Sequence, residues 1–149
     1  MINSDKVTVS VSVKREQKHF WLKLIGMALL VHIMLIAISI FEVFIYSYLI
    51  NPGQSQELYN THAQITGPWI SGIFGSVFMF LLVKRYIKKF GANLFLYSIA
   101  LPVVYIVTDV MILILAGANV FDHPVQLISA NGVKVIAALA AYYIYKPKG

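Results

Sequence analysis

The amino-acid sequence predicts an all-α membrane protein, a four-transmembrane-helix bundle with its N- and C-termini in the cytoplasm. Hydrophobic residues make up 59% of the 149 residues and charged residues only 12%, whereas soluble domains are about 45–50% apolar. The apolar residues gather in four segments, each long enough to cross the ~30 Å hydrocarbon core of a bilayer as a helix. Eleven of the twelve basic residues lie near the ends of the apolar spans or beyond them, at positions that this topology places on one side.

Residues 1–19 are predicted to form a polar, basic N-terminal arm, ahead of a transmembrane domain at 20–149. Valine alternates with serine or threonine from Val7 to Val13, and this period of two is typical of a short strand. A lone strand has no pairing partner in a helical chain, so we expect a mobile arm. Pairing of this segment with a second copy is the alternative.

The first predicted span covers residues 20–50 and ends at Asn51-Pro52-Gly53, because proline and glycine favour a turn. Its apolar run is too long for a cleavable signal peptide. The second predicted span covers 66–86, with Thr66 as the N-cap and Pro68 in the first turn. A polar loop is therefore expected between these two spans.

The third predicted span covers residues 94–116 and follows the turn Gly91-Ala92-Asn93. The fourth covers 124–145, with Asp122 as a capping residue and Pro124 at the first helical position. The four spans leave no room for a second folded domain of ordinary size.

The distribution of basic residues sets the predicted orientation. Five lie in the N-terminal segment, four between residues 84 and 89 and two at the C-terminus, while the loops at 51–66 and 117–123 contain none. Cytoplasmic loops are enriched in lysine and arginine, so the termini and the 84–89 segment are predicted to be cytoplasmic. The absence of cysteine and of a glycosylation sequon fits a reducing compartment, and we expect a bacterial inner (plasma) membrane.

The twelfth basic residue, Lys134, falls near the middle of the fourth span. Insertion scales assign such a lysine a cost of about 2.5–3.5 kcal/mol, which a carboxylate partner or a wet cavity offsets. Helical spacing places Asn131 and several small residues on its face, so Lys134 is predicted to point into the protein. Asp109, roughly 6 Å outside the midplane, is the favoured counter-ion, and Glu42 is the alternative.

Lys134, Asp109 and Glu42 thus form a predicted charged site in the outer half of the membrane. Helical spacing adds supporting polar residues to this site: Asn131, Tyr105, Ser39, Tyr46 and His32. These residues predict a water-accessible pocket that binds or transports a small polar solute, an ion or a proton. The same residues fit a purely structural role, in which Lys134 and Asp109 pair and fix the helix register.

Two other classes of function remain open. A non-enzymatic accessory or scaffold subunit would use Lys134 or Glu42 to meet a partner protein within the bilayer. A membrane-embedded lipid-modifying enzyme would need Tyr105, Asp109 and Lys134 as acid or base, but no recognisable nucleophile–base spacing supports it, and we assign no catalytic residue. Small-residue faces at 71–75 and 137–141 suit helix association, so a homodimer is also expected.

No metal or cofactor is expected. His62 and His123 are weak candidates as metal ligands together with Glu57 and Asp122, since these residue types can bind zinc. Helix capping and solvated histidines explain the same residues. The net charge of +6 follows from the topology, so the lipid bilayer rather than a nucleic acid is the expected partner.

Overall fold

The computed structural model describes residues 4–90, 93–117 and 124–147, and the side chains of all of these except 4–19 and 90. This part of the chain is all-helical, with no strand. The elements in chain order are α1 (Ser4–Ile45), the π-helix η1 (Tyr46–Ile50), α2 (Gln56–Phe90), α3 (Leu94–Leu115) and α4 (Pro124–Tyr145). Four of these helices contain segments long and apolar enough to cross a membrane, which confirms that part of the predicted fold class.

Helix α1 begins at Ser4 and therefore includes the segment that we expected to be a mobile arm or a strand. A helix satisfies its backbone hydrogen bonds within the segment, whereas a strand needs a partner that the described chain does not provide. The end of the first span agrees with the sequence. The N–H of Asn51 donates to the carbonyl oxygen of Tyr46 (2.8 Å), and Gly53 adopts a left-handed conformation with φ of 77° in the predicted turn.

Helix α2 is longer at both ends than the predicted span at 66–86, and the assignment of Thr66 as its N-cap is wrong. The helix begins at Gln56, where the hydroxyl of Ser55 accepts a hydrogen bond from the N–H of Leu58 (3.4 Å) in the manner of an N-cap. Pro68 lies inside the helix. It removes one backbone donor there, and the flanking turns continue the helix through it.

Helices α3 and α4 match their predicted spans to within one residue. Asn93 precedes α3 in a left-handed conformation with φ of 51°, and Gly117 follows α3 with φ of 76°. Glycine at the latter position ends a helix without steric cost. The predicted cap Asp122 lies outside the described residues.

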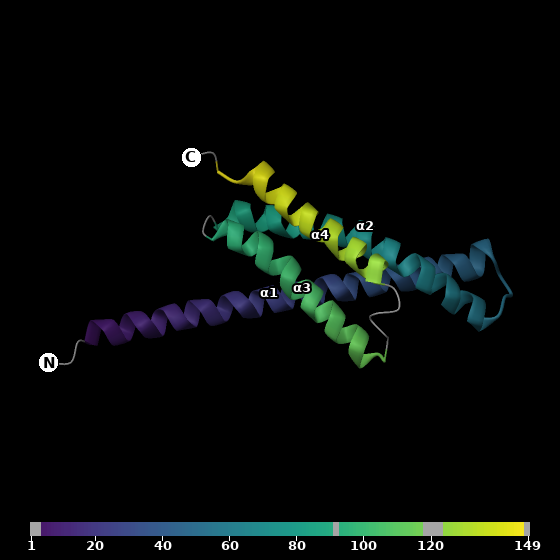
Figure 1. Ribbon diagram of the computed structural model, residues 1–149, viewed down its shortest axis with the longest axis horizontal. Coiled ribbons are helices and arrows are strands. Elements are labelled where there is room, and N and C mark those ends of the chain that lie inside the picture. The colour runs from purple at the N-terminus through teal and green to yellow at the C-terminus, as the bar shows by residue number, and fades with distance from the viewer. Residues whose placement is uncertain (1–3, 91–92, 118–123, 148–149) are drawn as a thin grey trace.

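The chain forms two helical hairpins of unequal length (Figure 1). The apolar spans of α1 and α2 contain 31 and 34 residues, whereas those of α3 and α4 contain 22 each. At 1.5 Å per residue the first pair exceeds the second by roughly 15 Å. The α1–α2 hairpin projects beyond α3 and α4 at its η1 turn, which we call the hairpin end (Figure 1). The opposite end, which carries Lys84 to Lys89 of α2 and the C-terminus, is the basic end.

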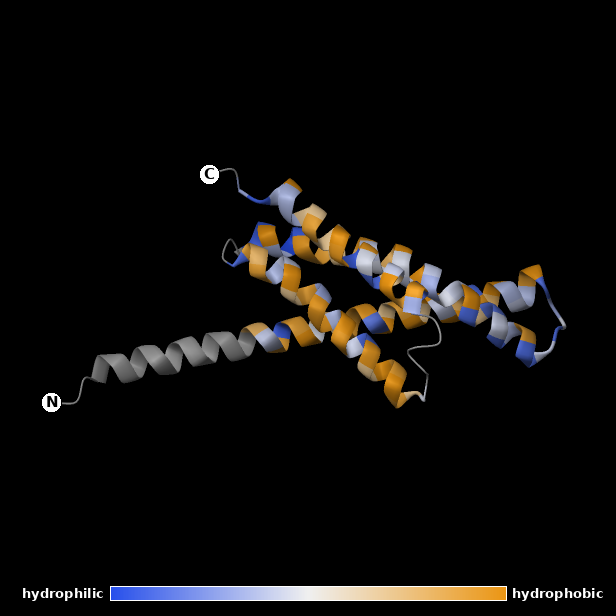
Figure 2. Cartoon of the chain, viewed as in Figure 1, coloured by the Kyte–Doolittle hydropathy of each residue, from blue (hydrophilic) through white to orange (hydrophobic). Residues whose placement is uncertain are grey.

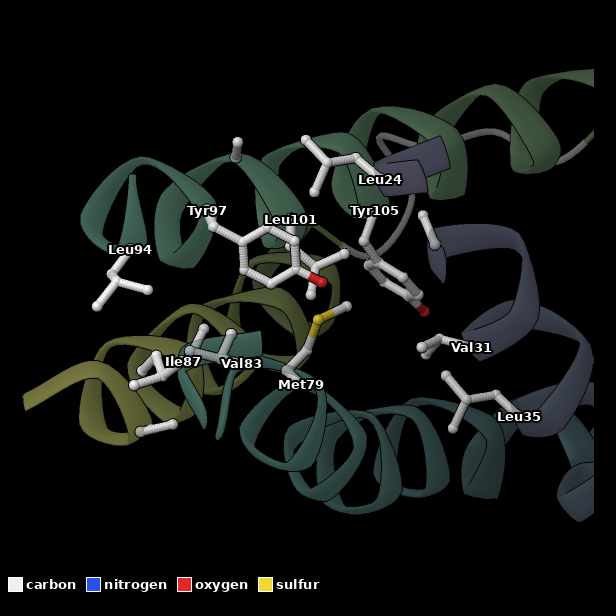
Figure 3. Packing of buried hydrophobic residues seen from close by; sticks show 14 residues of the cluster. Leu24, Val31, Leu35, Met79, Val83, Ile87, Leu94, Tyr97, Leu101 and Tyr105 are labelled. Carbon is white, nitrogen blue, oxygen red and sulfur yellow. The ribbon is translucent and has the colours of Figure 1, made fainter. Parts of the chain in front are cut away.

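The apolar core occupies mainly the half of the bundle nearer the basic end. Leu24, Met79, Val83, Tyr97 and Leu101 pack together there from three helices (Figure 3). On α3 the buried residues stop at Tyr105, although the helix continues to Leu115. Side-chain burial therefore decreases from the level of Tyr105 towards the hairpin end.

Hydrophobic residues occur along all four helices (Figure 2), and many of the large ones are exposed. Ile33, Ile73 and Ile136, from three different helices, are all at least 60% exposed. A soluble monomer rarely exposes continuous apolar surface on this scale, because the surface would drive association in water. A surface of this kind suits contact with lipid chains.

Candidate functional site

Lys134 lies in the interior of the bundle, with a side chain that is 0% exposed. Its Nζ donates hydrogen bonds to Oγ of Ser71 on α2 (2.8 Å) and to Oδ1 of Asn131 one turn earlier on α4 (3.1 Å). The ring of Tyr105 on α3 lies 4.6 Å from Nζ, within cation–π distance. The predicted inward orientation of Lys134 is confirmed, and Asn131, predicted on the same helix face, contacts it.

Gly75 on α2 provides the space for the stem of this lysine. A Cβ atom at position 75 would overlap Cε of Lys134 and would lie 3.2 Å from its Cδ. One turn earlier, a Cβ at Gly72 would lie 3.8 Å from the Cα of Ala130. The small residues of α2 thus let α4 approach closely, and Gly75 accommodates the lysine chain where the two helices meet.

Asp109 does not form the direct ion pair with Lys134 that the sequence led us to expect. Its Oδ1 lies 3.3 Å from Nε2 of His32 on α1, and the other ion pair among the described side chains joins His62 to Glu42. The reason is steric. The Lys134 stem enters the space at Gly75 on α2, while Asp109 lies one turn beyond Tyr105 on the neighbouring α3.

Tyr105 connects the two parts of the site. Its ring stacks on the imidazole of His32 (centroids 4.1 Å apart, planes at 16°) and also lies over Nζ of Lys134. Nδ1 of His32 contacts the carbonyl oxygen of Ala28 (2.8 Å), which fixes the ring. We call Lys134, Tyr105, His32 and Asp109 the interior cluster. Three helices thus bring four groups that can exchange or stabilise a proton into contact.

The interior cluster lies where the packed core ends. Towards the basic end it meets buried apolar side chains such as Leu101 and Met79. Towards the hairpin end burial decreases, since the side chain of His32 is 8% exposed and that of Asp109 is 21% exposed. The His32–Asp109 part of the cluster is therefore more exposed than Lys134.

Glu42 belongs to a second group of residues and not to the surroundings of Lys134. Ten residues separate it from His32 on α1, a rise of about 15 Å towards the hairpin end. Its Oε1 lies 2.6 Å from Nε2 of His62, and its Oε2 accepts a hydrogen bond from Oγ1 of Thr66 (3.2 Å). The ring of Tyr46 stacks on His62 at a centroid distance of 3.5 Å. We call these four residues the hairpin cluster.

The two clusters share one arrangement. In each, a carboxylate and a tyrosine lie four residues apart in the chain, and a histidine from another helix contacts the carboxylate through Nε2 and stacks on the tyrosine. α1 contributes the histidine to the interior cluster and the carboxylate to the hairpin cluster, whose tyrosine is the first residue of η1. Both arrangements hold an imidazole in a fixed orientation against a proton acceptor.

The weak metal candidates do not form a site in the described part of the chain, where no group of three or more potential ligands occurs. His62 contacts Glu42, and Glu57 is exposed in the first turn of α2. His123 and Asp122 lie outside the described residues. Ser39 is half-buried on α1, and among the described side chains it has no hydrogen bond to either cluster.

Three residues that contact the predicted site residues were not placed beside them by the sequence. Ser71 and Gly75 were expected only to form a small-residue packing face. Their spacing of one helical turn places them on the same face of α2, where small residues leave space for the side chain of a lysine on a neighbouring helix. His62 was assigned to a loop because the second span was predicted to begin ten residues too late. With α2 extended to Gln56, His62 and Thr66 fall on one helical face, and both contact Glu42.

A groove of about 360 Å³ runs between α2 and α4 on the outside of the bundle. Trp69, Gln126 and Ser129 contribute to its walls, but none of Lys134, Asp109 and Glu42 does. The predicted pocket, in which these three residues together bind a solute, is therefore not formed by the described residues. What the structure offers instead is a contiguous set of polar side chains inside the bundle.

Comparisons of the chain with models of protein families, with curated proteins and with solved structures found no match.

Proposed function

We propose that this chain is a multi-pass membrane protein that moves protons through its bundle, alone or together with a small polar solute. The observation that carries the proposal is the contact of Lys134, Tyr105, His32 and Asp109 at the level where the packed core ends. Ionisable residues within membrane spans are costly, and they commonly serve ion and proton pathways.

The surroundings of Lys134 support a proton-handling role over a solute-binding role. Its Nζ contacts two neutral oxygens and one aromatic ring, so no carboxylate holds it in a direct ion pair. Neutral partners of this kind accommodate an amine that gains and loses a proton more readily than a fixed counter-ion does. Asp109 and His32, on the other side of Tyr105, supply the acceptor and donor through which a proton would reach or leave the lysine.

The direction of access follows from the burial gradient. Protons would enter from the hairpin end, where the hairpin cluster offers Glu42 and His62 at the surface. The apolar layer around Leu101 and Met79 closes the path towards the basic end. Transport would therefore require this layer to open, as in a carrier with alternating access, and would not use a permanent channel.

The orientation and location of the protein form part of the same proposal. The basic end with Lys84 to Lys89 would face the cytoplasm and the hairpin end the outside, as the excess of positive charge favours. A bacterial inner membrane would supply the proton gradient that drives such a protein.

The proposal can be tested by measuring proton flux into liposomes that contain the purified protein. A potassium gradient with valinomycin supplies the driving force, and a pH-sensitive dye inside the liposomes reports proton entry. We expect flux well above that of empty liposomes, and we expect Lys134→Met to reduce it at least about tenfold, since an apolar side chain cannot bind a proton.

Glu57→Gln is the matched control for this assay, because Glu57 is an exposed carboxylate outside both clusters. Its flux should equal that of the unaltered protein. Flux no greater than that of empty liposomes, or flux unchanged in Lys134→Met, would overturn the proposal.

An accessory or scaffold subunit is the second candidate, and one observation favours it. Among the described residues, every buried side-chain nitrogen and oxygen has a hydrogen-bond partner. A fully satisfied polar group can fix the register of a bundle without any transport. Absence of flux together with a stoichiometric membrane protein in affinity purifications from native membranes would support this candidate.

The two remaining alternatives have less support. A lipid-modifying enzyme would need Tyr105 and Lys134 at a surface, but their side chains are 1% and 0% exposed. A homodimer through the face at 71–75 would compete with contacts inside the protomer, where Ser71 and Gly75 already hold Lys134. The face at 137–141 includes Ala138 and Ala141, both buried in the core.

A further inference from the structure

The basic end of the bundle carries a concentrated positive charge on one face of α2. Lys84, Arg85, Lys88 and Lys89 line a shallow surface groove of about 560 Å³, together with Leu81. Positions 84 and 88, like 85 and 89, are one helical turn apart and therefore neighbours on the helix surface. Like charges at this spacing repel one another, and an anion bound near them lowers this repulsion.

The carboxylates with described side chains lie away from this groove. Three carboxylates have described side chains, and all lie elsewhere: Glu42 in the hairpin cluster, Asp109 in the interior cluster and Glu57 at the start of α2. None of the described carboxylates is within ion-pair distance of Lys84, Arg85 or Lys88.

Aromatic rings at the end of α4 hold part of this charge in place. Nζ of Lys84 and Nζ of Lys88 lie 4.9 and 5.7 Å from the ring centroid of Tyr145. Lys146 lies over Tyr143 at 5.0 Å, which adds another ammonium group at this end. Because tyrosines and lysines gather at the level of lipid headgroups, these contacts place the groove at the membrane surface.

The groove also has a polarity that suits an amphiphile. Leu81, at the edge nearer the middle of the bundle, is 50% exposed and apolar, and the cationic residues follow over the next two turns. A phospholipid alongside α2 would place its acyl chains against the apolar part of the helix and its phosphate among the cations. The positive groove complements an anionic headgroup better than a zwitterionic one, whose own ammonium group it would repel.

We propose that this groove on α2 is a binding site for an anionic phospholipid of the adjacent leaflet. Lys84, Arg85 and Lys88 would contact the phosphate, and Leu81 would contact the upper part of an acyl chain. Tyr145 would act as a positioning residue that holds the ammonium groups of Lys84 and Lys88 together. The site is separate from the interior cluster and does not depend on proton movement.

Native mass spectrometry of the purified protein tests this site directly. The protein is mixed with equal amounts of dioleoyl phosphatidylglycerol and dioleoyl phosphatidylcholine, which differ only in the headgroup. We expect phosphatidylglycerol to be retained at least about fivefold more than phosphatidylcholine, because several cations contact its phosphate. The variant Lys84→Gln/Arg85→Gln/Lys88→Gln/Lys89→Gln should retain the two lipids equally.

A charge-matched control separates a site from a general excess of positive charge. The variant Lys6→Gln/Lys14→Gln/Arg15→Gln/Lys18→Gln removes the same number of cations from the N-terminal segment, and it should keep its preference for phosphatidylglycerol. Equal loss of preference in both variants, or no preference in the unaltered protein, would overturn the proposal. Displacement of the lipid by millimolar glycerol 3-phosphate would also overturn it, since a site for soluble phosphates would then be present.

A second variant keeps the test decisive if loss of four charges impairs folding. Tyr145→Leu retains every charge and removes only the ring beneath Lys84 and Lys88. We expect its preference for phosphatidylglycerol to fall by about twofold or more, as loss of a cation–π contact implies. An unchanged preference in this variant would contradict the positioning role of Tyr145.

Discussion

At the scale of single residues, the site depends on how one lysine is accommodated. Lys134 places its stem against Gly75 and its ammonium group between Ser71, Asn131 and the ring of Tyr105. A lysine in a membrane span is unfavourable by several kcal/mol without such partners. The hydrogen bonds and the aromatic ring offset this cost, and the small residue on α2 makes the arrangement sterically possible.

Substitution of Gly75 should therefore be damaging although it adds only one methyl group. In Gly75→Ala the new Cβ would displace the Lys134 stem and weaken its bonds to Ser71 and Asn131. We expect the free energy of unfolding in detergent to fall by about 1–3 kcal/mol, as for overpacked cores. Gly132→Ala is the matched control, since a Cβ at Gly132 meets nothing within 4 Å. Equal effects of the two substitutions would contradict the assigned role of Gly75.

The pairing of Asp109 with His32 can be measured by a double-mutant cycle. His32→Leu and Asp109→Leu remove the two partners of the 3.3 Å contact. The stability losses should be non-additive, with a coupling energy of about 0.5–3 kcal/mol. The cycle that combines Lys134→Met with Asp109→Leu should give a smaller coupling energy. These two residues form no direct ion pair, since the ammonium group of Lys134 lies against the ring of Tyr105 and its stem is directed towards Gly75 on α2. A larger coupling energy between Lys134 and Asp109 than between His32 and Asp109 would support Asp109 as the direct counter-ion of Lys134.

At the scale of helices, the sequence predicted α3 and α4 well and α2 poorly. The limits of α3 and α4 follow from Asn93, Gly117 and Pro124, each next to a long apolar run. Thr66-Gly67-Pro68 carries the same type of helix-start signal, but it lies inside α2. The true start at Ser55 lacks an apolar run because the first three turns of α2 lie in the projecting hairpin. Local signals therefore could not decide which of the two starts is used.

Because α2 extends to Gln56, the hairpin cluster forms polar contacts between α1 and α2 near the η1 turn. Glu42 contacts His62 and Thr66, and Tyr59 donates a hydrogen bond to the carbonyl oxygen of Asn51 (2.9 Å). Few buried apolar residues support this part of the hairpin. Its stability should depend on these polar contacts more than that of the core half does.

Glu42→Gln combined with His62→Ala should loosen the hairpin end without unfolding the bundle. Hydrogen bonds that involve a carboxylate contribute about 1.5–3 kcal/mol, so amides between residues 42 and 66 should exchange at least about tenfold faster. Amides around Leu101 should keep their protection. The measurement is hydrogen–deuterium exchange with Glu57→Gln as the control, and uniform acceleration along the chain would contradict a local role.

At the scale of the whole molecule, composition and periodicity predicted the four apolar helices, the inward orientation of Lys134 and the position of Asn131 on the same helix face. They could not predict which side chains from different helices meet, because faces and depths leave several pairings possible. Two basic residues, Lys134 and His32, lie at a depth that would allow an ion pair with Asp109. Tyr105 packs against both of them, and Asp109 contacts His32. Glu42 was expected near Lys134 because both fall in the outer half of the predicted membrane region, but its partners are His62 and Thr66 on α2.

The orientation of the molecule in a membrane can be tested because the chain contains no cysteine. Single cysteines at Ser55, near the hairpin end, and at Lys88, at the basic end, report opposite sides of the bilayer. We expect Ser55→Cys to react with an impermeant maleimide in intact cells and Lys88→Cys to react only after permeabilisation, as the positive-inside rule implies. Labelling of Lys88→Cys in intact cells would reverse the orientation.

The most direct test of a proton-carrying interior cluster is the flux of Asp109→Asn in liposomes, measured together with its melting temperature. Asparagine has nearly the same shape as aspartate and can still hydrogen-bond to His32, so the fold should persist, but it cannot take up a proton. We predict a melting temperature close to that of the unaltered protein and proton flux reduced at least about tenfold. Unchanged flux in a stable Asp109→Asn protein would contradict the account.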